Sequence, residues 1–245
     1  MRAAATASAA QGGNWPRLLA DRLGDIAATW QESAEVCADA TWQARATGTS
    51  ALRLLDTGHL PHADAPVVTR ALRHIQLTAL RYDFRCRRIE ALLDTLPART
   101  KDELDCYTRA LWAFALLGQS RTSGYPLMEQ VLDESGLHAK TVHVLLHGLW
   151  LGHGLPGREE AMLRLASMPV LAGDPIARFR AAAAHRGLGN YRPALKAIDD
   201  ALDLLSPEQS DVRADFVRER CLITAADDIG RLCGTPGEQG EGSLR

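Results

Sequence analysis

The sequence predicts an all-α protein, an α-solenoid of antiparallel helix pairs stacked in series with a helical cap at its N-terminal end. Two observations predict this class. Hydrophobic residues make up 46% of the 245 residues, and most of them are Ala and Leu, which lose little side-chain freedom in a helix. Pro and Gly separate apolar-periodic stretches of roughly 12–18 residues, the usual length of a helix in a globular protein.

Four segments are expected along the chain: a disordered tail over 1–13, an N-terminal helical cap over 14–66, helical repeats over 67–233 and a disordered tail over 234–245. Both tails consist mainly of small and polar residues, which favours disorder. The helices are expected over 15–29, 32–56, 67–82, 84–96, 100–118, 123–135, 138–152, 157–168, 174–188, 191–205 and 208–232.

The spacing of the glycines at expected helix ends predicts a repeat architecture. Gly118, Gly152 and Gly189 each follow a Leu at the expected end of a helix, and they recur at nearly equal intervals. Glycine suits such positions because it adopts the left-handed conformation that ends many helices. The interval is close to about 34 residues, which is typical of repeats that contain two helices and two turns.

The clearest copy begins at Gly189-Asn190-Tyr191 and continues through Ala194, Ile198 and Ala201 to Pro207. It resembles the second half of a tetratricopeptide repeat, and Ala181 and Ala182 match the small residues of the first half. The resemblance extends over 67–207, with a loose match at 82–97 and longer or altered turns at 119–126 and 153–157. It implies a superhelical stack whose first helices line a concave groove that holds a peptide or a partner helix. Such repeats also occur within bacterial transcriptional regulators.

Composition excludes several classes of function. A net charge of −2 gives no general attraction to nucleic acid or to an anionic membrane. The five cysteines include no CxxC pair, a usage typical of the reducing cytoplasm, and no run of about 18 apolar residues predicts a membrane span. Neither a P-loop, a GxSxG elbow nor a GxGxxG motif is present, so no catalytic residue and no cofactor is expected.

His143 and His147 are the strongest candidates for chemistry, since residues four apart lie on one face of a helix. Val144, Leu145 and Leu146 separate them, so the HExxH pattern of metalloproteases lacks its Glu. Because His147 and His185 are expected at similar places in successive helices, we interpret them as packing or groove-lining residues rather than metal ligands. A ligand-binding or catalytic contact remains the alternative.

The other candidates for partner contacts are basic or aromatic. Between 67 and 100 the chain contains seven Arg and three acidic residues. The guanidinium group of Arg can bind a carboxylate or phosphate through two parallel hydrogen bonds. A solvated face is the alternative for this patch. Trp112 and Trp150 are expected in equivalent helices of successive repeats, either in the groove or in the core. The expected contact residues are Arg70, Arg73, Arg81, Trp112, His143, His147, Trp150 and His185.

The sequence therefore predicts a non-enzymatic, cytoplasmic helical-repeat scaffold that binds a protein or peptide partner, and a regulatory role is compatible with it. A small-molecule-binding protein or enzyme with a pocket at His143 and His147 is the first alternative. A homodimer in which the helices of 15–57 pair between chains is the second. Neither a membrane nor a nucleic acid is an expected partner.

Overall fold

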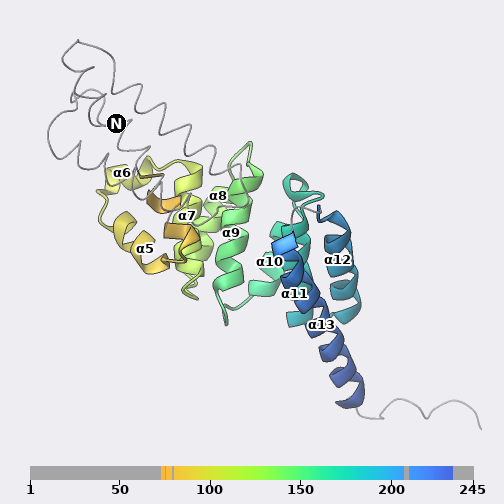
Figure 1. Cartoon of the computed structure of the whole chain (residues 1–245). Helices are drawn as coiled ribbons and strands as arrows, with labels where there is room; N and C mark the ends of the chain where they lie inside the picture. Colours follow the sequence, from red (N-terminus) through yellow and green to blue (C-terminus); the bar gives the residue numbers. More distant parts are fainter. Residues whose placement is uncertain (1–72, 75, 79, 207–209, 234–245) are drawn as a thin grey trace, which may run out of the picture. The chain divides into compact units, whose positions relative to one another are not determined.

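The computed structural model describes residues 73, 74, 76–78, 80–206 and 210–233, and every regular element in these residues is helical (Figure 1). A helical segment ends at Tyr82. It is followed by α5 (Cys86–Asp94), α6 (Ala98–Asp102), α7 (Cys106–Leu117), α8 (Gly124–Leu132), α9 (Ala139–Leu151), α10 (Arg158–Ala166), the short 3₁₀ helix η1 (Pro169–Leu171), α11 (Pro175–Gly187), α12 (Tyr191–Leu204) and α13 (Ser210–Cys233). The expected cap over 14–66 and both expected tails lie outside the described residues.

Most of the helices expected between 84 and 232 are confirmed to within a few residues, but the continuous helix expected over 100–118 is wrong. The structure divides it into α6 and α7. Asp105 is extended, with φ −68° and ψ 161°, and its side chain accepts a hydrogen bond from the backbone N–H of Thr108. This is the geometry of a helix N-cap, which competes with helix continuation at this residue.

The expected left-handed glycine is confirmed only at Gly189, whose φ is +74°. Gly118 and Gly152 keep negative φ values of −64° and −77°. The left-handed residue comes two positions later in each case, at Ser120 (φ +59°) and Gly154 (φ +79°). After α7 and α9 the chain therefore continues for two more residues before it reverses.

The helix starts recur at nearly regular intervals along the chain. We call α7, α9, α11 and α13 first helices, and they begin at Cys106, Ala139, Pro175 and Ser210. We call α5, α8, α10 and α12 second helices, and they begin at Cys86, Gly124, Arg158 and Tyr191. In both series the starts lie close to the period of about 34 residues that two-helix repeats show. First and second helices thus alternate, and α6 is an addition between α5 and α7.

The described helices belong to two compact units. The first contains the helical residues up to Tyr82 and α5–α8, and the second contains α9–α13 together with residues 120–122. In the first unit α7 packs against both α5 and α8 and buries eight of its twelve residues. A helix apolar on most sides is expected where neighbours cover more than one face.

Glycine permits the close approach of α7 and α8. A Cβ atom added to Gly124 would lie 2.7 Å from Cγ of Leu117 and 3.0 Å from its backbone nitrogen. Both distances are shorter than ordinary carbon contacts. The absence of a Cβ atom at Gly124 therefore allows the short separation between α7 and α8.

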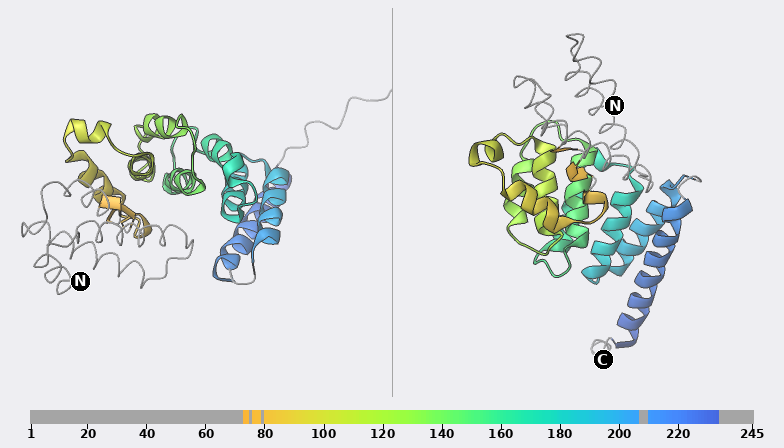
Figure 2. Two further views of the ribbon diagram at one scale, coloured as in Figure 1. Left: turned by 90° about the horizontal axis from the view of Figure 1, so that it is seen from above. Right: turned by 60° about the vertical axis from the view of Figure 1, so that its left-hand side comes forward.

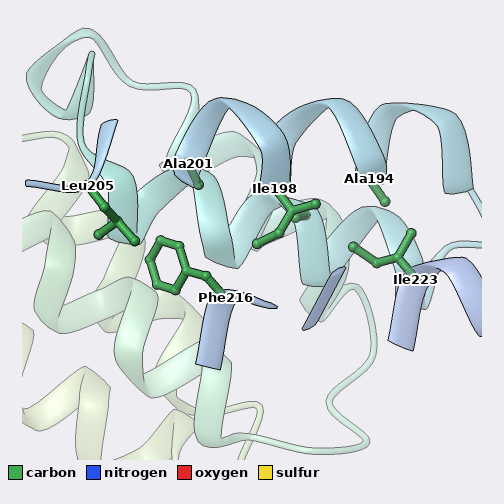
Figure 3. Close-up of a cluster of buried hydrophobic side chains, with 7 residues drawn as sticks. Ala194, Ile198, Ala201, Leu205, Phe216 and Ile223 are labelled. Carbon is green, nitrogen blue, oxygen red and sulfur yellow. The ribbon is translucent and has the colours of Figure 1, made fainter. Parts of the chain in front are cut away.

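In the second unit α12 packs against α11 and α13, and the three helices lie side by side in both views of Figure 2. Their shared core contains Ala182 of α11, Ala194, Ile198 and Ala201 of α12, Leu205 after α12, and Phe216 and Ile223 of α13 (Figure 3). The small Ala side chains allow close helix approach, and Ile198 and Phe216 fill the space between the helices.

An ion pair also fixes α13 against α11. The carboxylate of Glu219 is only 5% exposed, and its Oε1 accepts a hydrogen bond of 2.7 Å from Nε of Arg186. Nη2 of the same guanidinium lies 3.4 Å from the other carboxylate oxygen. A buried carboxylate requires such a partner, so this pair determines which side of α13 faces α11.

Two glycine substitutions should change stability in opposite directions. Gly124→Ala should lower the free energy of unfolding by about 1–3 kcal/mol, because the new methyl group meets Leu117 in a packed interface. Gly230→Ala in α13 is the matched control, because its Cβ meets only Cε2 of Tyr191, at 3.4 Å. It should raise that free energy by about 0.5–1 kcal/mol through helix propensity. Urea unfolding measures both changes, and equal effects of the two substitutions would contradict the close packing.

Candidate functional site

The most regular polar feature of the structure is a histidine that binds the aspartate at the start of a first helix. His74 lies in the helical segment before α5, and its Nε2 is 2.9 Å from Oδ2 of Asp105 and 2.9 Å from Oγ1 of Thr108. Asp105 is the N-cap of α7 and accepts from both the backbone N–H and the hydroxyl of Thr108, at 2.9 and 2.7 Å. One carboxylate therefore caps α7 and binds the preceding helical segment.

The same arrangement occurs again two repeats further along the chain. Nε2 of His143 in α9 lies 2.9 Å from Oδ2 of Asp174, the N-cap of α11. The Asp174 carboxylate also accepts a 2.7 Å hydrogen bond from the backbone N–H of Ala177. In both cases the His and the Asp are 31 residues apart in the sequence.

Arginine occupies the corresponding position between these two histidines. Arg109 of α7 forms an ion pair through Nη2 with Glu134, which lies between α8 and α9. His74, Arg109, His143 and Arg178 follow one another at nearly equal intervals, one in each repeat. We call the three observed contacts, His74–Asp105, Arg109–Glu134 and His143–Asp174, the junction pairs.

The junction pairs change the acidity of both capping carboxyls. Burial raises the pKa of Asp105, but the hydrogen bond and charge of His74 and the hydrogen bonds from Thr108 outweigh it. The net pKa of Asp105 lies well below its usual range. The pKa of Asp174 is lowered in the same way, since His143 and backbone N–H groups of α11 outweigh the effect of burial.

Three aromatic rings connect the first helices of the second unit. The rings of Trp150 in α9 and Phe179 in α11 have centroids 5.3 Å apart. Phe179 stacks on Phe216 of α13, with centroids 4.6 Å apart and planes 13° from parallel. Phe216 is buried, whereas Trp150 and Phe179 are partly exposed. We call this set the aromatic row. Trp150 thus packs against Phe179 and is also partly exposed to solvent.

The remaining histidines do not share one environment. His147 is the ninth residue of α9 and His185 is the eleventh of α11, so the expectation of equivalent positions is wrong. Both side chains are partly buried. Nδ1 of His185 is buried without a hydrogen-bond partner, and burial lowers the pKa of this imidazole. The unsatisfied ring nitrogen of His185 is available for a polar contact.

In the first unit, the structure describes three of the four predicted contact residues, and Arg70 lies outside the described residues. Arg73 and Arg81 are partly buried, and the guanidinium carbon of Arg81 is 5.4 Å from the ring centroid of Tyr82. Nζ of Lys101 in α6 is 5.3 Å from the ring centroid of Trp112. Nε of Arg81 and Nε1 of Trp112 are buried donors without a hydrogen-bond partner.

The two tryptophans lie in successive first helices, as expected, but at different positions along them. Trp112 is the seventh residue of α7 and contacts a lysine, whereas Trp150 is the twelfth residue of α9 and contacts Phe179. The eight predicted contact residues therefore divide between the units. Their role in binding stays a prediction.

Sequence reasoning missed Asp105, Asp174 and Phe179. A usable signal existed for the first two, because a His–Asp separation of 31 residues occurs twice, two repeats apart. Phe179 gave no comparable signal, since its ring contacts depend on how α9, α11 and α13 pack.

Within the described residues, no group of three or more His, Cys, Asp or Glu side chains is arranged to hold a metal ion, and no helix there is long and apolar enough to span a membrane. No family model matches the chain, and no curated protein or solved structure matches it either.

Replacing a capping aspartate should destabilise the fold. Asp174→Ala should lower the free energy of unfolding by about 1–2 kcal/mol, because α11 loses its N-cap and His143 loses its hydrogen-bond partner. Asp203→Ala is the control, because Asp203 is an exposed residue of α12 outside any cap. Chemical denaturation measures the two changes, and an equally small effect of both would contradict the assigned role of Asp174.

The lowered pKa values of Asp105 and Asp174 predict loss of stability in acid. A carboxyl whose pKa is lower in the folded state stabilises the protein above its unfolded pKa of about 4, and this contribution is lost as pH falls through the folded pKa. The free energy of unfolding should therefore decrease below about pH 5. In the double variant Asp105→Asn with Asp174→Asn, the decrease measured by urea unfolding should be shallower, and an unchanged slope would contradict this assignment.

Proposed function

We propose that the chain is a non-enzymatic tetratricopeptide-like repeat scaffold that binds a protein or peptide partner on the first helices α9 and α11 of its second unit. The regular alternation of first and second helices is the observation that supports this proposal most directly. Repeated helix pairs bury their apolar faces against their neighbours and leave one face of the stack for a partner. The cysteine usage fits a cytoplasmic location for such a scaffold.

The packing of α11 and α12 supports the resemblance at the level of single residues. Ala182, Ala194, Ile198 and Ala201 were expected as small or apolar contact residues, and all four are fully buried in one core. Gly124 of α8 provides a similar close approach to α7 in the first unit. Close helix approach at small residues thus occurs in both units.

The aromatic row supports the choice of surface. Trp150 and Phe179 lie on successive first helices and remain partly exposed, although their rings pack together. His147 and His185, with an unsatisfied nitrogen on His185, belong to the same two helices. Partly exposed aromatic residues are usual anchors of protein interfaces.

The alternative of a small-molecule binder or enzyme at His143 is less well supported. His143 already binds Asp174, and His74 makes the same contact with Asp105 in the other unit. Because the same His–Asp contact occurs in both units, a structural role at a helix start is enough to explain it. Catalysis at one of its copies would need a further polar group, and a screen of metals and metabolites for raised thermal stability tests this alternative.

Partner capture tests the scaffold. The full chain, immobilised and exposed to extract of its native cells, should retain a specific protein. Trp150→Ala, His147→Ala and His185→Ala should each reduce the retained amount about tenfold or more if they contact it, since interface anchors contribute about 1.4 kcal/mol or more each. Glu160→Ala is the control and should retain the partner, because Glu160 is an exposed residue of the second helix α10.

The thermal midpoint of each variant must stay near that of the wild type for the comparison to hold. Retention of the same partner by all three first-helix variants would contradict the proposed surface. Failure of the wild-type chain to retain any protein, together with a specific small-molecule hit in the stability screen, would favour the alternative.

A further inference from the structure

The last described helix carries an apolar stripe on its outward side. On one side of α13, mostly three or four positions apart, lie six exposed residues that are apolar or nearly so: Ala214, Val217, Cys221, Leu222, Ala225 and Ile229. Val217 is 46% exposed, Leu222 45% and Ile229 60%. Residues at this spacing lie along one side of a helix, and we call this set the α13 stripe.

The opposite side of α13 accounts for the packing of this helix within the unit. Phe216 and Ile223 enter the core shared with α11 and α12, and Glu219 binds Arg186 of α11 (Figure 3). A helix at the surface of a monomer normally carries mostly polar residues opposite its buried face. The α13 stripe instead exposes large apolar side chains there, which is typical of a protein interface.

The preceding first helix, α11, has more helices around it than α13 has. α11 packs against α9, α10, α12 and α13. Among the described elements, α13 has contacts of comparable extent only with α11 and α12. The residues that follow, 234–245, contain Leu244 as their one large apolar residue, so their composition does not supply an apolar helix to cover the stripe.

The charges on the same side of α13 favour a second copy of this helix in antiparallel orientation. In a pair related by a twofold axis, residues whose numbers have a constant sum lie opposite each other. One such register places Val217 opposite Ile229, Cys221 opposite Ala225 and Arg218 opposite Asp228. Arg218 and Asp228 are both exposed, so each would meet a residue of opposite charge on the other copy. A parallel pair would place Arg218 opposite Arg218.

We propose that the α13 stripe is a self-association surface on which a second copy of this chain binds, with the two α13 helices antiparallel. The stripe runs from Ala214 to Ile229, which corresponds to about 24 Å of helix. An interface based on one helix of this length is smaller than the usual stable interface, so the dimer should be concentration-dependent, with a dissociation constant in the micromolar range. This proposal is independent of the partner surface on α9 and α11.

Sedimentation equilibrium of the full chain from about 1 to 200 μM tests the proposal, a range that brackets a micromolar dissociation constant. The average mass should rise from that of one chain toward twice that value. Leu222→Glu combined with Ile229→Glu should abolish the rise, because two charges per chain would enter the apolar contact. Since both side chains are exposed in the single chain, helix content and thermal midpoint at low concentration should be unchanged.

Charge reversal tests the identity and orientation of the occupant. Arg218→Asp and Asp228→Arg should each weaken the dimer about tenfold, because each creates two like-charged contacts in a twofold pair. Combining both reversals in one chain should restore dimerisation. Glu160→Arg, on exposed α10, is the control and should leave the dissociation constant unchanged.

Three results would overturn the proposal. The first is a monomer over the whole range, which would mean that another protein, another part of the chain or only solvent contacts the stripe. The second is a dimer that survives Leu222→Glu with Ile229→Glu. The third is a dimer that the combined charge reversal fails to restore, which would exclude the antiparallel pairing of Arg218 with Asp228.

Discussion

In each unit a histidine from an earlier helix binds the aspartate that caps a later one: His74 binds Asp105 at the start of α7, and His143 of α9 binds Asp174 at the start of α11. The residue at which each of these capped helices begins depends on this contact. In two of the three junction pairs the acid is the N-cap itself. Such a carboxylate binds the backbone N–H groups that a helix start leaves unpaired, and it binds the histidine that reaches it from the preceding repeat. Moving the start of the helix by one residue would break both contacts at once.

The apolar contacts contribute most of the stabilising free energy, but they are less specific. Ala, Leu and Ile side chains would pack in several neighbouring registers at similar cost, whereas a buried or half-buried carboxylate tolerates only the register in which its partners are in reach. The ion pair of Arg186 with Glu219 has the same effect for α13. By fixing which side of α13 is buried, it also leaves the α13 stripe on the outside.

Most of the helices between 84 and 232 could be predicted from the sequence, because Pro and Gly separate them. The superhelical stack that the resemblance over 67–207 implies stays a prediction. The helix break at Asp105 was missed because capping depends on a hydrogen bond to Thr108 that competes with local propensity. The candidate surface was predicted only in part. Residue type identified Trp150 and His185, but the aromatic row depends on the packing of three helices that are distant in sequence.

A double-mutant cycle on His143 and Asp174 tests most directly whether the junction pair couples successive first helices. The free energies of unfolding of the wild type, His143→Ala, Asp174→Ala and the double variant give the interaction energy, free of the separate loss of the N-cap. We expect a coupling of about 0.5–1.5 kcal/mol, the usual net contribution of a partly buried hydrogen bond. Additive effects of the two substitutions, with no coupling beyond experimental error, would contradict the account.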